Sequence, residues 1–396
     1  FMSDTTLDRI LKQCHSFVAN PDSNYMDDIF AQKLKAFSNP AFSSEDQKKL
    51  CTYHHKLILT EVIPAYQELA DSLESLRGTG KSSRGLAFFE GGREYYLYLL
   101  QSQTGTYVPV GQIEKRLSAQ LLSDYREISS LLKQNSSLID RLNQCSGELT
   151  LTPTQMLEKL PELMKKDFPE LKDATYELRT VHPSMKKFLS PAFYLTPPVD
   201  TRTPNVIYIN DSGRTSSLEL FGTLAHEGFP GHLYQTVSFA ENNPSDIRYL
   251  VTSSGYVEGW ATYVESYGYE YAASLMNDPD SAKNAVRFAW LNRSMNLCIY
   301  SLIDIGIHYR GWDAARTAVF LKAFGINNAS TAAEIYQYIV ETPGNYLKYY
   351  WGYLNFLDLK TVCQKRLGDD FDLKEFHRRI LDIGPVQFPV LEKYMK

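Results

Sequence analysis

A chain of 396 residues that is 43% hydrophobic and 22% charged has the composition of a globular protein with room for about two to three domains. Its net charge of -5 and the lack of a basic block argue against a nucleic-acid partner. No run reaches the roughly 18 apolar residues of a membrane span, so we expect no transmembrane segment in this chain.

The five cysteines lie far apart and include no Cys-x-x-Cys pair. They indicate neither a disulfide framework nor a thiolate metal site. No signal peptide is visible, but the opening residues Phe1-Met2-Ser3 resemble a processed end, so a removed leader stays open. The sequence therefore leaves the compartment, cytoplasmic or extracytoplasmic, and the oligomeric state open.

The first part of the chain has the apolar spacing of helices. Residues 5–76, 110–142 and 153–164 carry hydrophobic side chains at helical intervals, as Leu7 and Leu11 do in the first of these segments. Ser136-Ser137 is a local turn signal inside the second segment. We predict an N-terminal helical region over residues 1–175.

Three extended segments follow. Residues 177–182 alternate in the manner of a strand, residues 192–195 end before two prolines, and residues 205–210 are bounded by a proline and a turn. From residue 256 onward the chain is helical again almost to its end. The predicted fold is mainly α, with a small mixed β-sheet next to the helix that carries the active site.

The clearest functional signal is the segment HEGFPGH, residues 226–232, at the end of an apolar helix that Ser216 or Ser217 is placed to cap. Many zinc hydrolases carry two histidines four residues apart on one helix face, with a glutamate beside the first as general base. Here His226 and His232 are six residues apart. In an unbroken helix their side chains would point about 120° apart and could not share an ion.

Pro230 and Gly231 lie between the two histidines and change this geometry. The proline ring clashes with the carbonyl group four residues earlier, which belongs to His226, and interrupts the helix. Gly231 accepts dihedral angles that other residues avoid. Two residues can then loop out and bring His232 back beside His226. The alternative is a helix that simply ends at Phe229, with the two histidines in unrelated hydrogen bonds.

A zinc hydrolase needs a third protein ligand and an open fourth position. The best candidate is Glu258, in the segment GYVEGWATYVE at residues 255–265. Glu258 and Glu265 are one heptad apart and share a helix face, and small residues such as Gly259 would let this helix approach the first one closely. The alternative is a solvated acidic face. The aromatic neighbours favour burial, however, and a buried carboxylate needs a cationic partner.

Together these segments resemble the bacterial domain-of-unknown-function family 885 (DUF885), whose members look like zinc-dependent peptidases of the zincin type with a glutamate ligand (gluzincin-like). The resemblance rests on HEGFPGH, on GYVEGWATYVE and on residues 304–312, 343–352 and 371–377. It covers the chain well from residue 181 to the C-terminus and the N-terminal helices only loosely. It implies a zincin-like catalytic region over residues 176–396.

The resemblance implies three ligands for Zn²⁺, which are His226, His232 and Glu258. Glu227 would be the general base that polarises the water on the metal, and His308 and Tyr349 would hydrogen-bond the oxyanion of the tetrahedral intermediate. The implied activity is zinc-dependent hydrolysis of short or extended peptide substrates. Manganese or cobalt would suit the same mixed ligands.

The chain departs from the family pattern at three positions. Leu233 stands where a second histidine commonly follows the ligand, Gln337 where an arginine is usual, and Asn345 where a glutamine is usual. The change at Gln337 puts in doubt which end of the substrate is held, because a guanidinium binds a carboxylate in a way that an amide cannot.

Other interpretations stay open. His308 lies on an apolar helix and is as well explained as a core histidine, and Tyr349 lies among tyrosines that could serve packing alone. Asp304 is expected to orient a neighbour or cap an internal hydrogen bond, and His182 and His377 are expected to be structural. The protein could also be a catalytically inactive binding or surface protein on a peptidase scaffold, or a metal-dependent hydrolase of non-peptide amides.

Overall fold

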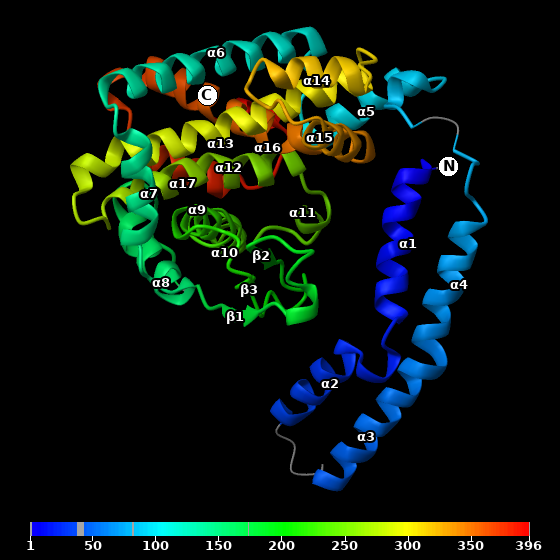
Figure 1. The fold of residues 1–396 in the computed structure, drawn as a ribbon. Helices are drawn as coiled ribbons and strands as arrows, with labels where there is room; N and C mark the ends of the chain where they lie inside the picture. The colour runs from blue at the N-terminus through cyan, green and yellow to red at the C-terminus, as the bar shows by residue number, and fades with distance from the viewer. Residues whose placement is uncertain (1, 38–42, 81–82, 173, 396) are drawn as a thin grey trace. The chain divides into compact units, whose positions relative to one another are not determined.

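The structure is a computed structural model that describes residues 2–37, 43–80, 83–172 and 174–395. Its internal contacts divide it into two compact units, Phe1–Arg84 and Gly85–Lys396. We describe each unit by itself (Figure 1).

The first unit is helical, as its apolar spacing predicted. Leu7, Leu11 and Cys14 of the first helix pack against Ala70 of the last one and form a small core. The helices are α1 (Asp4–Val18), α2 (Tyr25–Ala36), α3 (Ser44–Leu57) and α4 (Ile63–Glu74), with a π-helical segment over Ile58–Val62 before α4.

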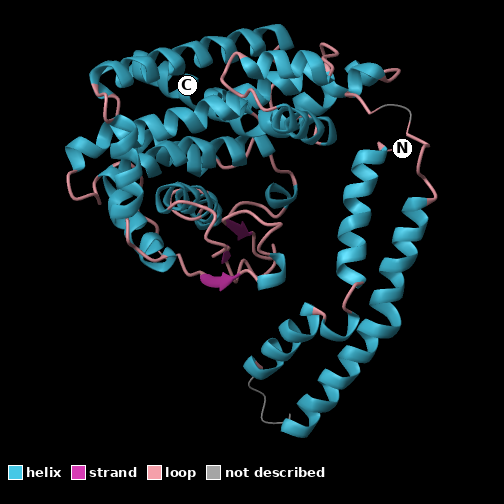
Figure 2. Cartoon of the chain, in the orientation of Figure 1, coloured by secondary structure: helices cyan, strands magenta, loops and turns pink. Residues whose placement is uncertain are grey.

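The second unit is also mainly helical, with three short strands (Figure 2). Its first helices are α5 (Gly92–Thr104), α6 (Val110–Gln134), α7 (Leu138–Glu148) and α8 (Pro153–Leu163). After the strands come α9 (Ser217–Glu227), α10 (His232–Glu241), α11 (Ile247–Leu250), α12 (Ser254–Ala273) and α13 (Pro279–His308). The chain ends with α14 (Ala314–Lys322), α15 (Ala329–Glu341), α16 (Asn345–Leu367), α17 (Leu373–Ile383) and α18 (Phe388–Met395).

The three strands lie where the sequence predicted them. They are β1 (Glu177–Thr180), β2 (Ala192–Leu195) and β3 (Val206–Ile209), in the order β1-β3-β2. β1 pairs with β3 in parallel and β2 pairs with β3 antiparallel, so the sheet is mixed. β2 is an edge strand and packs against α9.

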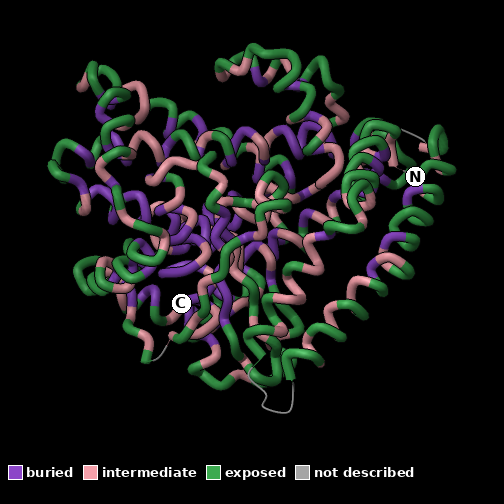
Figure 3. Tube along the Cα trace, turned by 60° about the horizontal axis from the view of Figure 1, so that its bottom comes forward, coloured by how far each residue is buried: buried purple, intermediate pink, exposed green. Residues whose placement is uncertain are grey.

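The elements of the second unit form layers. α9 lies between the small sheet and α12, and α13 packs between α12 and α6 (Figure 1). Buried positions concentrate where these helices meet (Figure 3). Their shared core contains side chains from α6, α8, α9 and α12, among them Leu117, Leu157, Phe221 and Trp260.

This core corrects the domain boundary expected between residues 175 and 176. The helices α5 to α8 precede that boundary, yet they belong to the same compact unit as the sheet and α9. The physical reason is that their apolar faces are buried within this unit: Leu117 and Leu121 of α6, for example, belong to the core that α6 shares with α13.

Glycines set the closest helix contacts around α12. A Cβ atom at Gly259 would lie 2.5 Å from the Cα and carbonyl carbon of Gly352 in α16. A Cβ atom at Gly268 would lie 2.5 Å from the Cβ of Ala225 in α9. The expected close approach of α12 to α9 therefore exists, but it occurs at Gly268, whereas Gly259 serves the contact with α16.

We expect Gly259→Ala to lower the free energy of unfolding by about 1–3 kcal/mol, because the added methyl group meets backbone atoms that cannot rotate away. Gly147→Ala is the control, since a Cβ atom there meets nothing within 4 Å and alanine favours the helix. Urea unfolding of both variants measures the difference. Equal stability of the two would contradict the packing described for α12 and α16.

Candidate metal centre

The helix α9 begins with a capping box. Ser216 accepts a hydrogen bond from the backbone N–H of Glu219, and the Glu219 carboxylate accepts one from the backbone N–H of Ser216. The buried side chains of Phe221 and Leu224 hold one face of the helix in the core. The last turn of α9 then carries His226, and Glu227 ends the helix.

The chain bends between the two histidines. α9 ends at Glu227 and α10 begins at His232. The turn needs glycine at position 231, since a Cβ atom there would lie 1.8 Å from the carbonyl oxygen of His226. Trp260 donates its indole N–H to the carbonyl oxygen of Pro230 at 2.9 Å and holds the turn against α12.

As a result, the two imidazoles lie side by side, with ring centroids 4.8 Å apart. Glu258 of α12 reaches both rings: its Oε2 lies 3.8 Å from Nε2 of His226 and 3.4 Å from Nε2 of His232. One ligand atom from each of the three residues lies within 4.8 Å of the others. The structure thus brings together the three predicted metal ligands.

These three residues fit a zinc ion. Zinc binds imidazole nitrogen and carboxylate oxygen at about 2.0–2.2 Å, which places the ligand atoms of a tetrahedral site roughly 3.3–3.5 Å apart. The separations between Glu258 and the two rings are close to that value. Three ligands on one side also leave a fourth position for water.

The charges around His226 favour a cation. Burial opposes a charged ring, but the nearby carboxylates of Glu258 and Glu265 and the charge of Glu227 outweigh it and raise the pKa of His226 to about 10. Burial raises the pKa of Glu258, but the adjacent rings of His226 and His232 outweigh it and hold that pKa well below its usual range. The carboxylates thus stabilise positive charge at the point where the ligand atoms meet.

A second carboxylate lies behind His226. Oε2 of Glu265 is 3.4 Å from Nδ1 of His226, and Oε1 accepts a hydrogen bond at 2.9 Å from Nε of Arg293 in α13. Glu265 is only 4% exposed. A carboxylate on the far nitrogen of a histidine ligand orients the ring and selects its tautomer.

Glu227 lies between the metal ligands and the sheet. Its Oε2 accepts a hydrogen bond at 2.9 Å from the backbone N–H of Tyr194 in the edge strand β2. Its other oxygen has no hydrogen-bond partner within the described part of the chain. The glutamate is therefore oriented by β2 and keeps one oxygen available to a reactant.

Tyr349 of α16 also lies beside His226: the two rings are stacked, with centroids 6.3 Å apart. Burial raises the pKa of the Tyr349 hydroxyl, and the negative charge of Glu258 raises it further, so the hydroxyl keeps its proton. The neighbouring Lys348 lies 3.7 Å from Oε1 of Glu258. Tyr349 is thus a hydrogen-bond donor beside the candidate metal centre.

A cavity of about 710 Å³ opens onto this group. His226, Glu227 and Tyr349 line it together with Ala192 of β2 and Arg293 of α13. A cavity of this size accepts a short segment of peptide.

His308 is not part of this group. It is fully buried, its Nδ1 accepts a hydrogen bond from the backbone N–H of Leu86 at 3.1 Å, and its Nε2 donates to the carbonyl oxygen of Ile339 at 2.9 Å. Burial lowers its pKa to about 4, so the ring is neutral. Both ring nitrogens are already hydrogen-bonded, so His308 has no free N–H for an oxyanion. The structure therefore corrects the catalytic role predicted for His308 and makes it a core histidine.

The other polar residues behave as structural groups. Asp304 accepts hydrogen bonds from Tyr96 and from the backbone N–H of Gly344, which fixes the start of α16, and burial raises its pKa to about 7. His377 is buried between Tyr263 and the carbonyl oxygen of Asp167. His182 caps a short 3₁₀ helix.

The sequence did not single out Lys348 or Arg293. Lys348 lies next to Tyr349, within the segment at residues 343–352 that resembles the family. Its position beside Tyr349 could have indicated a place near the site. No feature of the sequence indicated Arg293, because it lies on a long helix without a motif and contacts the site through Glu265.

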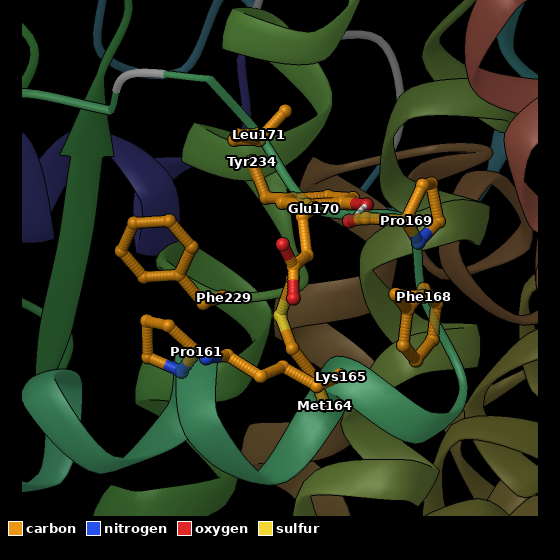
Figure 4. A pocket seen from close by; sticks show the side chains of 9 residues that line it. All are labelled: Pro161, Met164, Lys165, Phe168, Pro169, Glu170, Leu171, Phe229 and Tyr234. Carbon is orange, nitrogen blue, oxygen red and sulfur yellow. Dashed lines mark hydrogen bonds between the residues drawn. The ribbon is translucent and has the colours of Figure 1, made fainter.

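A second cavity of about 220 Å³ lies behind the turn at residues 228–231 (Figure 4). Phe229 and Tyr234 line it together with Met164 and Phe168, and none of the candidate ligands or catalytic residues does. It therefore adds nothing to the chemistry of the metal centre.

A model of the family described as "Bacterial protein of unknown function (DUF885)" matches residues 2–395. A comparison with curated proteins finds no match. Several solved structures are similar, and two of them are described as putative lipoproteins. One is described as a putative lipoprotein from Colwellia psychrerythraea, with a TM-score of 0.84, 22% identity and coverage of 100% of this chain and 70% of that chain.

The other is described as a putative lipoprotein of unknown function from Shewanella oneidensis. It has a TM-score of 0.60 and 17% identity, and the match covers 92% of this chain and 69% of that chain. At such identities the likeness extends to the fold alone. In the described part of this chain, no helix is long and apolar enough to span a membrane.

Proposed function

The chain belongs to the bacterial DUF885 family, and from the side chains at its candidate metal centre we propose that it is a zinc-dependent peptidase of zincin-like architecture. The observation that carries the proposal is the convergence of His226, His232 and Glu258, with Glu227 beside the first ligand and facing a cavity. Zinc hydrolases of this type use two imidazoles and one carboxylate as ligands, with an adjacent glutamate that does not bind the metal.

His226, His232 and Glu258 would hold the ion. Bound zinc would supply Lewis-acid activation of the attacking water and of the substrate carbonyl. Glu227 accepts the proton of that water as its oxygen bonds to the carbonyl carbon. It then delivers the proton to the leaving nitrogen as the carbon–nitrogen bond breaks. The hydrogen bond from Tyr194 keeps this carboxylate in place during both transfers.

Two further features support a peptide substrate. The Tyr349 hydroxyl is protonated and lies beside Glu258, where it can donate to the developing oxyanion. The edge strand β2 contributes Ala192 to the cavity and is paired on one side only within the described residues. An extended peptide can add to such an edge through backbone hydrogen bonds and place its scissile bond near Glu227.

The test is digestion of a peptide library by the full chain, with and without a chelator, set against small non-peptide amides. We expect zinc-dependent cleavage of peptides that the chelator abolishes and added zinc restores. Cleavage of the small amides alone would replace the peptidase with an amidase. A protein that carries no metal at neutral pH and cleaves neither class would be a binding protein on this scaffold.

A further inference from the structure

Resting on the proposed peptidase function, we infer that Arg293 binds the free C-terminal carboxylate of the substrate, so that the protein acts on short peptides or peptide ends close to their C-terminus.

The guanidinium of Arg293 has unused donors. Its Nε donates to Glu265 at 2.9 Å, and its two terminal nitrogens have no hydrogen-bond acceptor among the residues that the structure describes. The side chain is 45% exposed and lines the cavity of about 710 Å³. A guanidinium with two free parallel N–H groups is suited to a planar carboxylate.

The charges of the cavity select one place for such an anion. Arg293 is the one arginine or lysine among the described residues that line it, and the acidic groups there are Glu219, Glu227 and Glu265. A substrate carboxylate is repelled by these glutamates, and Arg293 offers it a fixed positive charge away from the metal ligands. Asn292 and Asn296, on the same helix as Arg293, also line the cavity and offer amide donors beside it.

The guanidinium is held in place before substrate binds. Glu265 is buried, and its two oxygens contact Arg293 on one side and His226 on the other. This arrangement fixes the direction of the arginine, so little side-chain entropy is lost when a carboxylate binds.

The same contact sets the distance to the scissile bond. One carboxylate group separates Nε of Arg293 from Nδ1 of the candidate ligand His226. An extended peptide advances about 3.3 Å per residue, so a carboxylate held by Arg293 belongs to a residue about one or two positions after the cleaved bond. An endopeptidase would need open space at this point, whereas the cavity presents a charged group.

The experiment compares an N-acetylated tripeptide with its C-terminal amide, using the full chain loaded with zinc. We expect kcat/KM to favour the free acid by at least about tenfold, on the scale of a hydrogen bond to a charged group. In Arg293→Gln, which can still donate to Glu265, the preference falls to about one, and Arg293→Lys is intermediate. Arg287→Gln on the same helix is the control, because Arg287 pairs with Glu127 and does not line the cavity.

Equal turnover of acid and amide by the unaltered protein would overturn the inference, as would an Arg293→Gln variant that slows both substrates by the same factor. Binding of both peptides, measured by calorimetry, separates this inference from the peptidase proposal. An acid preference in binding that depends on Arg293, without hydrolysis, supports the carboxylate site and removes the peptidase. Hydrolysis of both peptides with no preference for the acid over the amide, in turnover or in binding, supports the peptidase and removes the carboxylate site.

Discussion

Replacement of Glu227 by glutamine is expected to leave zinc bound and to lower the turnover of peptide by at least about a hundredfold, the usual scale of general-base catalysis. The amide keeps the size of the side chain but cannot accept the proton of the attacking water. Since the carboxylate lies beside His226 and is not one of the three grouped ligands, the metal site should persist. Metal content by elemental analysis and kcat with a cleaved peptide measure the two effects.

Glu219→Gln is the matched control for this variant. Glu219 lies on the same helix and lines the same cavity, and glutamine can still complete the capping box with Ser216. We expect its turnover to stay within a few-fold of that of the unaltered protein. Full activity of Glu227→Gln would remove Glu227 from the mechanism, and loss of metal from that variant would make it a ligand instead.

The second large effect is expected from Glu258→Ala. It removes the carboxylate that lies within reach of both histidines, and two imidazoles alone hold zinc poorly. We expect zinc affinity to fall at least about a hundredfold, and hydrolysis to fall with it. That is more than the loss typical of residues that only orient a metal ligand. Competition with a zinc-sensitive fluorescent chelator measures the affinity.

Glu270→Ala is the control, because Glu270 lies on the same helix and is exposed, away from the metal group. It should bind zinc as the unaltered protein does. Circular dichroism of both variants shows whether α12 stays folded. A Glu258→Ala variant that folds and retains stoichiometric zinc would show that the ion, if present, is held by other groups.

Most of the local structure could be predicted from the sequence because it depends on neighbouring residues. Alternation and flanking prolines predicted strands within residues 177–182, 192–195 and 205–210, and the structure has strands at 177–180, 192–195 and 206–209. Ser216 and Ser217 were the two predicted caps of α9, and the structure has Ser216 as the cap. The break between His226 and His232 followed from the proline and glycine between them, and the structure confirms both the bend and the approach of the rings.

The errors concern contacts between segments far apart in the chain. The boundary expected near residue 175 was wrong, because the pattern of an amphipathic helix predicts an apolar face but not the element that packs against it. The same limit applies to Gly259, which was expected to face α9 and instead faces Gly352. For His308, the deciding partners are the backbone groups of Leu86 and Ile339, which no spacing around the histidine reveals.

The sequence by itself therefore determined the helices, the strands and the bend between the two histidines. These depend on periodicity, caps and turn residues, which act over a few positions. Only the tertiary structure decided that Tyr194 orients Glu227, that Glu265 joins His226 to Arg293, and that His308 belongs to the core. These contacts join residues that are tens to hundreds of positions apart, and the packing of the whole core sets them.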